Sequence, residues 1–212
     1  MIFLIPVAGA LFYIITQVLT TRDVNTFQNE ITSIVNPTKK IKDLEKKIEF
    51  TDTYANRMDL ADSYFEIKAY QNAISNYEIT LKDKSQNALY AHQQLVLCYF
   101  QMNDFDKVIS HVKQIKDKPE FKGSKHQFCY GLALREKGDL EAAERELKAI
   151  DRPYSNYSER LELAKFYIEN NRKEEGKSLL EDISNEAQHM TKPNRRLFRQ
   201  TINEVEQILK TL

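Results

Sequence analysis

The stretch "NRMDLADSYFEIKAYQNAISNYEITL", Asn56 to Leu81, decides the fold of this chain. Small and apolar side chains recur in it at helical spacing on both sides of a short polar break, "EIKAYQ". They are Leu60, Ala61, Tyr64, Ala73 and Tyr77. The pattern predicts two amphipathic helices joined by a turn, and the remaining question is whether this hairpin occurs once or is repeated.

Shifting the sequence against itself by 35 residues shows three copies of the hairpin. The shift places Tyr64 on Tyr99 and Leu134, Ala73 on Val108 and Ala143, Tyr77 on Val112 and Leu147, and Thr80 on Ile115 and Ile150. A further shift of 33 residues adds a fourth copy, with Gly131 on Ala164, Leu134 on Tyr167, Ala143 on Gly176, Leu147 on Leu180 and Ile150 on Ile183. A period of this length is typical of stacked units, each too small to bury its own apolar face.

The pattern shared by the copies is a small residue in the first helix, an aromatic or apolar residue three positions later, and a small residue in the second helix. In this respect the chain resembles the tetratricopeptide repeat (TPR) family. The third copy, "YGLALREKGDLEAAERELKAI", matches best, through Gly131, Gly138, Leu140, Ala143 and Leu147. The second and fourth copies depart from the pattern at Val96, Val108 and Lys173, and no copy has the family's tryptophan.

The sequence therefore predicts an all-α protein. We expect a right-handed α-solenoid of about four TPR-like helix pairs, with a single transmembrane helix before it and a C-terminal capping helix after it. The expected boundaries are 1–21 for the anchor, 22–53 for a polar linker with short helices, 54–187 for the array and 188–212 for the capping helix. Within the array, the copies cover about 54–86, 87–121, 122–153 and 154–187.

The N-terminal segment differs in composition from the rest of the chain. Ile2 to Leu19 carries no charge and is just long enough, at about 1.5 Å per residue, to cross the hydrocarbon core. No basic residue precedes it, and its small residues lie in its middle, so we expect a retained anchor rather than a cleaved signal. A buried soluble helix is a further alternative. The segment weakly resembles the N-terminal membrane segment of cardiolipin-synthase-like proteins, at Pro6, Gly9 and Tyr13.

Charges after the apolar segment predict its orientation. Arg22 lies at its boundary, lysines follow from Lys39, and only the amino terminus precedes it, so we expect the bulk of the chain to be cytoplasmic. The lysines belong to "KKIKDLEKKIEF", where Ile41, Leu44 and Ile48 recur at helical spacing. We interpret this stretch as a solvated helix face, with contact to anionic headgroups as the alternative.

Other sequence features argue against catalysis and against cofactor or metal binding. Acidic and basic residues number 31 each, so net charge gives nucleic-acid binding no support. "GKS" at Gly176 lacks the earlier glycine of a phosphate-binding loop, because Asn171 occupies that position. The four histidines do not form metal-ligand motifs, and Cys98 and Cys129 read as plain buried thiols. We expect a non-enzymatic protein.

The TPR resemblance implies a concave groove, lined by the first helix of each pair, that receives a peptide or helix of a partner. The residues that it places in this groove are Met58, Asp62, Phe65, Gln93, Leu97, Phe100, Phe128, Leu132, Arg135, Leu161, Lys165 and Ile168. Met58, Phe128 and Leu161 stand where the chaperone-binding subgroup has lysine or asparagine, so a chaperone tail is not the expected ligand. The alternative is that the three phenylalanines pack as core.

Two classes of function agree with these features. One is a membrane-anchored interaction module, a scaffold or adaptor that holds a protein partner in its groove. The other is a structural or assembly subunit packed permanently in a membrane protein complex. After the array, Arg195, Arg196 and Arg199 form a basic cluster that we interpret as solvated surface, with an acidic partner or a phosphate as the alternative.

Overall fold

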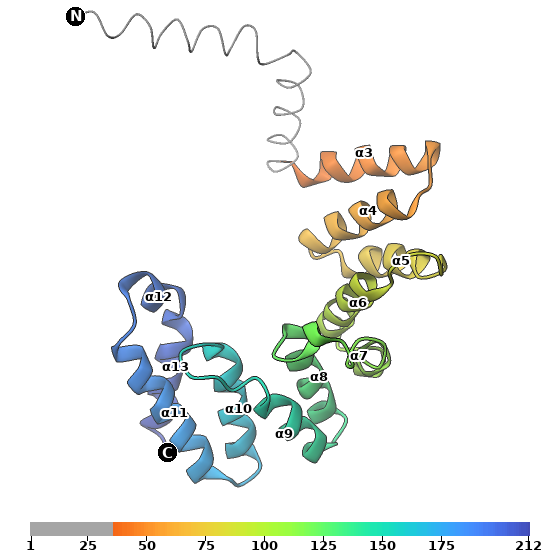
Figure 1. The fold of residues 1–212 in the computed structure, drawn as a ribbon. Coiled ribbons are helices and arrows are strands. Elements are labelled where there is room, and N and C mark those ends of the chain that lie inside the picture. Colours follow the sequence, from red (N-terminus) through yellow and green to blue (C-terminus); the bar gives the residue numbers. More distant parts are fainter. Residues whose placement is uncertain (1–35) are drawn as a thin grey trace, which may run out of the picture. The chain divides into compact units, whose positions relative to one another are not determined.

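The computed structural model describes residues 36–212 and shows them as a series of helices (Figure 1). The expected membrane anchor and the first part of the linker, residues 1–35, lie outside the described residues. Within the described range, no helix is both long enough and apolar enough to cross a membrane. The chain divides after Ile79 into two compact units, and each is described by itself.

The first unit holds α3 (Pro37–Phe50), α4 (Tyr54–Glu66) and nearly all of α5 (Tyr70–Thr80). Helix α3 packs against α4 through the face that carries Ile41, which is buried. The hydroxyl group of Tyr64 on α4 donates a hydrogen bond to Glu45 of α3. The stretch that we interpreted as a solvated helix face is thus a helix with one buried side.

The second unit holds the remaining helices. They are α6 (Leu89–Gln101), α7 (Phe105–Val112), the 3₁₀ helix η2 (Pro119–Phe121), α8 (Lys125–Glu136), α9 (Leu140–Lys148), α10 (Tyr157–Glu169), α11 (Lys173–Gln188), α12 (Lys192–Leu197) and α13 (Arg199–Leu209). Consecutive helices pair as α6 with α7, α8 with α9 and α10 with α11. With α4 and α5 of the first unit, the described residues contain four TPR-like pairs.

The turn inside each pair is built in the same way in all four copies. The residue at its centre has a positive φ angle, between 57° and 82°, which lets the chain leave one helix and start the next. These residues are Lys68, Asn103, Gly138 and Asn171. The amide of the next residue donates to a carbonyl five residues earlier, from Ala69 to Tyr64, Asp104 to Tyr99, Asp139 to Leu134 and Arg172 to Tyr167. The repeated aromatic or apolar position is therefore also the position at which the first helix closes.

Small residues allow the two helices of a pair to approach closely. A Cβ atom added to Gly176 of α11 would lie 2.8 Å from the backbone oxygen of Ala164 on α10. One added to Gly131 of α8 would lie 2.9 Å from the side chain of Leu147 on α9. Such distances leave no room for a larger side chain, which explains the small residues that recur in the sequence.

The core of the second unit extends from the third helix pair to the C-terminal helix. Leu147 of α9, Phe166 of α10 and Ile183 of α11 belong to one buried cluster with Val205 of α13. Complete burial of such a side chain stabilises a fold by roughly 1.5–3 kcal/mol. Helix α13 therefore closes the array by adding its own apolar side to the core of the last pair.

The capping segment differs from the single helix that we expected. Helix α11 continues to Gln188, and the chain then forms α12 and α13, which meet at Phe198. The ring of Phe198 packs against Tyr157, with ring centroids 5.0 Å apart, and this contact turns the chain between the two helices. Leu197 precedes Thr201 and Val205 at helical spacing, which predicts that the three share one helix face, but 75% of the surface of Leu197 is exposed while Val205 is buried.

A polar bridge between the two helices of a pair recurs with a separation of 19 residues. Arg57 donates to Asn76 over 3.0 Å, His92 contacts His111 over 2.9 Å between Nδ1 atoms, and Gln127 donates to Glu146 over 2.8 Å. In the fourth pair the first member is Arg160, which is only 3% exposed. Its partner position is the apolar Leu179, and it pairs instead with Asp151 and Glu186, each over 2.8 Å.

The histidine bridge predicts a loss of stability in acid. Two Nδ1 atoms can share one proton but not hold two, and burial lowers the pKa of His92. The unfolded chain therefore binds more protons near pH 6.5, and the free energy of unfolding falls as the pH drops below that value. We expect His92→Gln with His111→Glu, which copies the Gln127–Glu146 bridge, to lose less stability between about pH 7.5 and pH 5 than the parent chain.

Urea unfolding followed by circular dichroism at the two pH values measures this difference. His189→Gln, at an exposed histidine of the second unit, is the matched control. Burial also lowers the pKa of His126, so the double variant should keep part of the acid sensitivity. Equal losses in the parent chain and the double variant would show that the bridge does not titrate as described.

Candidate functional site

In the first unit, the predicted groove residues are engaged within their own helix pair. Met58 is buried, and Asp62 accepts a hydrogen bond from the hydroxyl group of Tyr77. The ring of Phe65 lies edge-on to Tyr70, with centroids 5.7 Å apart. Tyr77 and Tyr70 both lie on α5, so Asp62 and Phe65 hold α4 against α5, and this unit gives little support for a binding site at the three residues.

In the second unit, the predicted groove residues divide between the core and its edge. Leu132 and Leu161 are buried in the core, while Phe100, Phe128 and Ile168 are half-buried and pack against it. Gln93 and Leu97 are half-buried on α6. The alternative that the phenylalanines pack as core therefore applies in part to Phe100 and Phe128, each of which still has accessible surface.

The remaining two, Arg135 and Lys165, belong to an ion-pair network. Lys165 lies 2.8 Å from Glu162 and 2.7 Å from Glu204, and Arg135 lies 3.9 Å from Glu162. Burial alone would lower the pKa of Lys165, but its hydrogen bonds to the two carboxylates raise it above the ordinary value. The ammonium group stays charged and connects α10 to α13.

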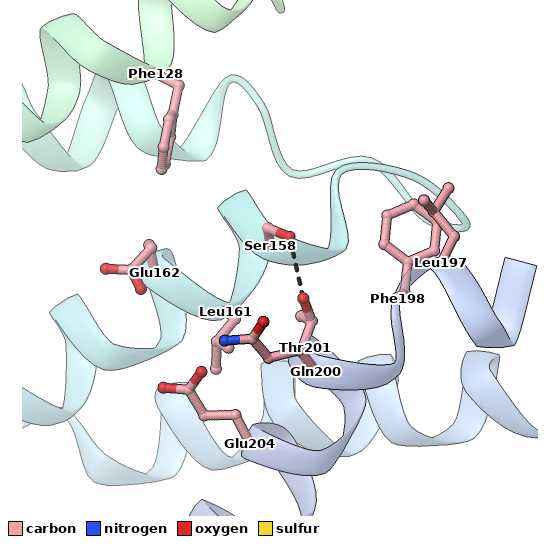
Figure 2. Close-up of a pocket in the computed structure, with 9 residues that line it drawn as sticks. All are labelled: Phe128, Ser158, Leu161, Glu162, Leu197, Phe198, Gln200, Thr201 and Glu204. Carbon is pink, nitrogen blue, oxygen red and sulfur yellow. Dashed lines mark hydrogen bonds between the residues drawn. The ribbon is translucent and has the colours of Figure 1, made fainter. Parts of the chain in front are cut away.

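A pocket of about 560 Å³ lies between α8, α10 and the junction of α12 with α13 (Figure 2). Phe128 and Leu161 from the predicted groove line it together with Ser158, Glu162, Leu197, Phe198, Gln200, Thr201 and Glu204. Ser158 and Thr201 share a hydrogen bond of 3.1 Å between their hydroxyl oxygens, which holds α10 and α13 together at the pocket. The pocket is thus partly apolar and has carboxylates at one side.

Sequence reasoning identified two of these lining residues and missed the contribution of the capping segment. The available signal was Leu197 followed directly by Phe198. This signal was weak, because two consecutive side chains of a helix lie about 100° apart and can both face a core, as Leu179 and Leu180 of α11 do. The sequence pattern alone therefore did not show that the helix breaks at this point or that Leu197 faces outward.

The described residues give little support for a catalytic or metal site. No group of three or more histidine, cysteine or acidic side chains in residues 36–212 is placed to hold a metal ion. Cys98 and Cys129 are buried thiols, and burial raises the pKa of Cys129 to about 12, so this thiol stays protonated at neutral pH. Gly176 lies within α11 against Ala164, which is not the setting of a phosphate-binding loop.

Comparison with solved structures shows the fold. The chain is similar to MamA, with a TM-score of 0.63 and 11% sequence identity over 81% of this chain and 96% of that one. A second MamA structure, MSR-1, gives a TM-score of 0.62 and 17% identity over 80% of this chain and 99% of that one. YrrB, described as a TPR protein with an unusual peptide-binding site, gives a TM-score of 0.62 and 14% identity over 76% of this chain and 83% of that one. No family profile matches the chain, and no curated protein matches it by sequence.

These similarities confirm the predicted TPR-type architecture of consecutive helix pairs. At such low identity they show the fold alone.

Proposed function

We propose that the chain is a protein-interaction module that binds a segment of a partner protein at the pocket between α8, α10 and the α12–α13 junction. The observation that carries the proposal is the composition of this pocket. Two predicted groove residues, Phe128 and Leu161, line it together with two apolar residues of the capping segment. These are Leu197, which is exposed, and Phe198, which is half-buried. An apolar anchor residue inserted into a partly preformed hollow is a common way for one protein to hold a short segment of another.

The TPR-type fold supports this proposal. Stacked helix pairs produce an extended surface that single helices lack, and this surface is what repeat proteins use for binding. YrrB, which shares this fold, is described as having a peptide-binding site. For this chain, peptide binding and the non-enzymatic role are our inference.

The test is affinity purification of the tagged full-length chain from the cells that make it, in a mild detergent, with quantitative mass spectrometry. We compare the parent chain with Gln200→Trp, which fills the pocket from its exposed rim. Partner proteins should be retained by the parent chain and depleted at least roughly tenfold by Gln200→Trp, because the bulky ring occupies the space of the anchor residue.

The matched control is Gln207→Trp, at an exposed glutamine of the same helix that does not line the pocket. It should retain the partners as the parent chain does, and all three proteins should have the same circular dichroism. Recovery of the same proteins with Gln200→Trp would exclude the pocket as the binding site.

We also propose that residues 1–21 anchor the module in a membrane, with the helix pairs on the cytoplasmic side. The support is the uncharged apolar run and the basic residues that follow it. Membranes washed with alkaline carbonate should retain the full chain and release a chain that lacks residues 1–21. Release of both would contradict the anchor.

A permanent assembly subunit is the second candidate. Phe50, at the end of α3, has 89% of its surface exposed and would be available to such an interface. Such a subunit should co-purify with its neighbours in fixed stoichiometry whether or not the pocket is filled.

A further inference from the structure

The short helix α12 and the start of α13 carry an excess of positive charge. Lys192, Arg195, Arg196 and Arg199 are all exposed. None of them forms an ion pair with a carboxylate of residues 36–212, although 14 ion pairs occur among other side chains of that range. The basic cluster noted in the sequence is therefore free to attract an external anionic group.

An exposed leucine lies in the middle of this basic surface. Leu197 lines a shallow hollow of about 580 Å³ together with Lys192, Pro193 and Arg196. It also lines the pocket of Figure 2, so the hollow and the pocket both border this side chain. One occupant that lies across Leu197 would meet both surfaces.

The acidic side of the pocket does not offset this positive charge. Glu162 and Glu204 are both bound by Lys165, and Glu162 also lies near Arg135. These carboxylates already have cationic partners inside the protein, whereas the four cations of α12 and α13 have no carboxylate partner in the described part of the chain. The unmatched charge at the site is positive.

We infer that the partner segment is an acidic stretch of protein that carries a bulky apolar side chain. Its carboxylates would lie against Lys192 and Arg196, and its apolar side chain would cover Leu197 and enter the pocket. Complementary charge would then guide the approach, and the apolar contact would hold the segment in place. The inference rests on the proposed protein-binding role and adds the chemistry of the partner.

The shape of the site favours a protein segment over a membrane surface or a nucleic acid. A flat bilayer can contact the exposed Leu197 but cannot reach Phe128 and Leu161 inside the pocket. A nucleic acid requires an extended basic surface, and this chain carries no net charge. A flexible acidic segment can contact the cations and place a side chain in the pocket.

Random copolymers test the inference without knowledge of the natural partner. The labelled full-length chain in a mild nonionic detergent is titrated with a glutamate–leucine copolymer, with polyglutamate and with a lysine–leucine copolymer, and binding is followed by fluorescence anisotropy. We expect the glutamate–leucine copolymer to bind at least roughly tenfold more tightly than either of the others, and its binding to weaken with added salt.

Variants separate the two parts of the site. Lys192→Glu with Arg196→Glu should weaken binding of the glutamate–leucine copolymer by roughly tenfold or more. Lys82→Glu with Lys84→Glu, at exposed lysines elsewhere in the second unit, is the matched control and should leave binding unchanged. Leu197→Ser should weaken binding of the glutamate–leucine copolymer by roughly fivefold and leave the weak binding of polyglutamate as it was.

The inference is overturned if the parent chain does not bind the glutamate–leucine copolymer, or if charge reversal at Lys192 and Arg196 has no effect. It is also overturned if the chain binds phosphatidylglycerol vesicles through Lys192 and Arg196, does not bind phosphatidylcholine vesicles, and does not bind the copolymer. If Gln200→Trp still depletes natural partners in that case, the protein-binding role stands and only the acidic chemistry is wrong. If Gln200→Trp depletes nothing, the binding role itself fails.

Discussion

The close approach of two helices at one small residue is the constraint on which the third and fourth helix pairs depend. At Gly176 a single methyl group would meet the backbone of the neighbouring helix at 2.8 Å, a distance that real contacts do not show. The turn that brings the helices together is fixed just as tightly, by a residue with positive φ and by an amide bonded to a carbonyl five residues earlier. This turn recurs in all four pairs, although the second pair has Val96 and Val108 where the other three have small residues.

The functional surface follows from how the last repeat is closed. An array of identical pairs would leave the apolar side of α10 and α11 in water, and α13 covers it with Val205. Closing the array in this way places the junction of α12 and α13 beside α8 and α10, where Phe128 and Leu197 come to line the same pocket. The capping segment therefore both completes the core and forms one wall of the proposed binding site.

Periodicity made the fold predictable, because it compares the chain with itself and needs no knowledge of other proteins. Positions such as Tyr64, Tyr99 and Tyr167 align because each closes the same turn. Where the copies differ, the sequence was less informative. The contact between His92 and His111 does not follow from any metal-ligand motif. It follows from the 19-residue spacing that also links Gln127 to Glu146, and this spacing joins different residue types in each pair.

The site was harder to predict than the fold for a physical reason. Phe128 and Leu161 could be placed on the first helix of their pairs, but their exposure depends on what packs over them. That in turn depends on the bend at Phe198, which is set by contact with Tyr157, 41 residues earlier in the chain. A contact so distant in sequence leaves no periodic signal, so the outward position of Leu197 could not be read from the helical pattern.

The most direct test of this account is the stability of Gly176→Val against Lys177→Val in the same helix. Lys177 is exposed, so its replacement by valine costs only the lower helix propensity of valine, about 0.5 kcal/mol, and a weak surface contact of 4.0 Å with Glu181. The account predicts that Gly176→Val lowers the free energy of unfolding in urea by roughly 2 kcal/mol or more, because the side chain has no room beside Ala164. Equal stability of the two variants would contradict the claim that close helix approach determines this fold.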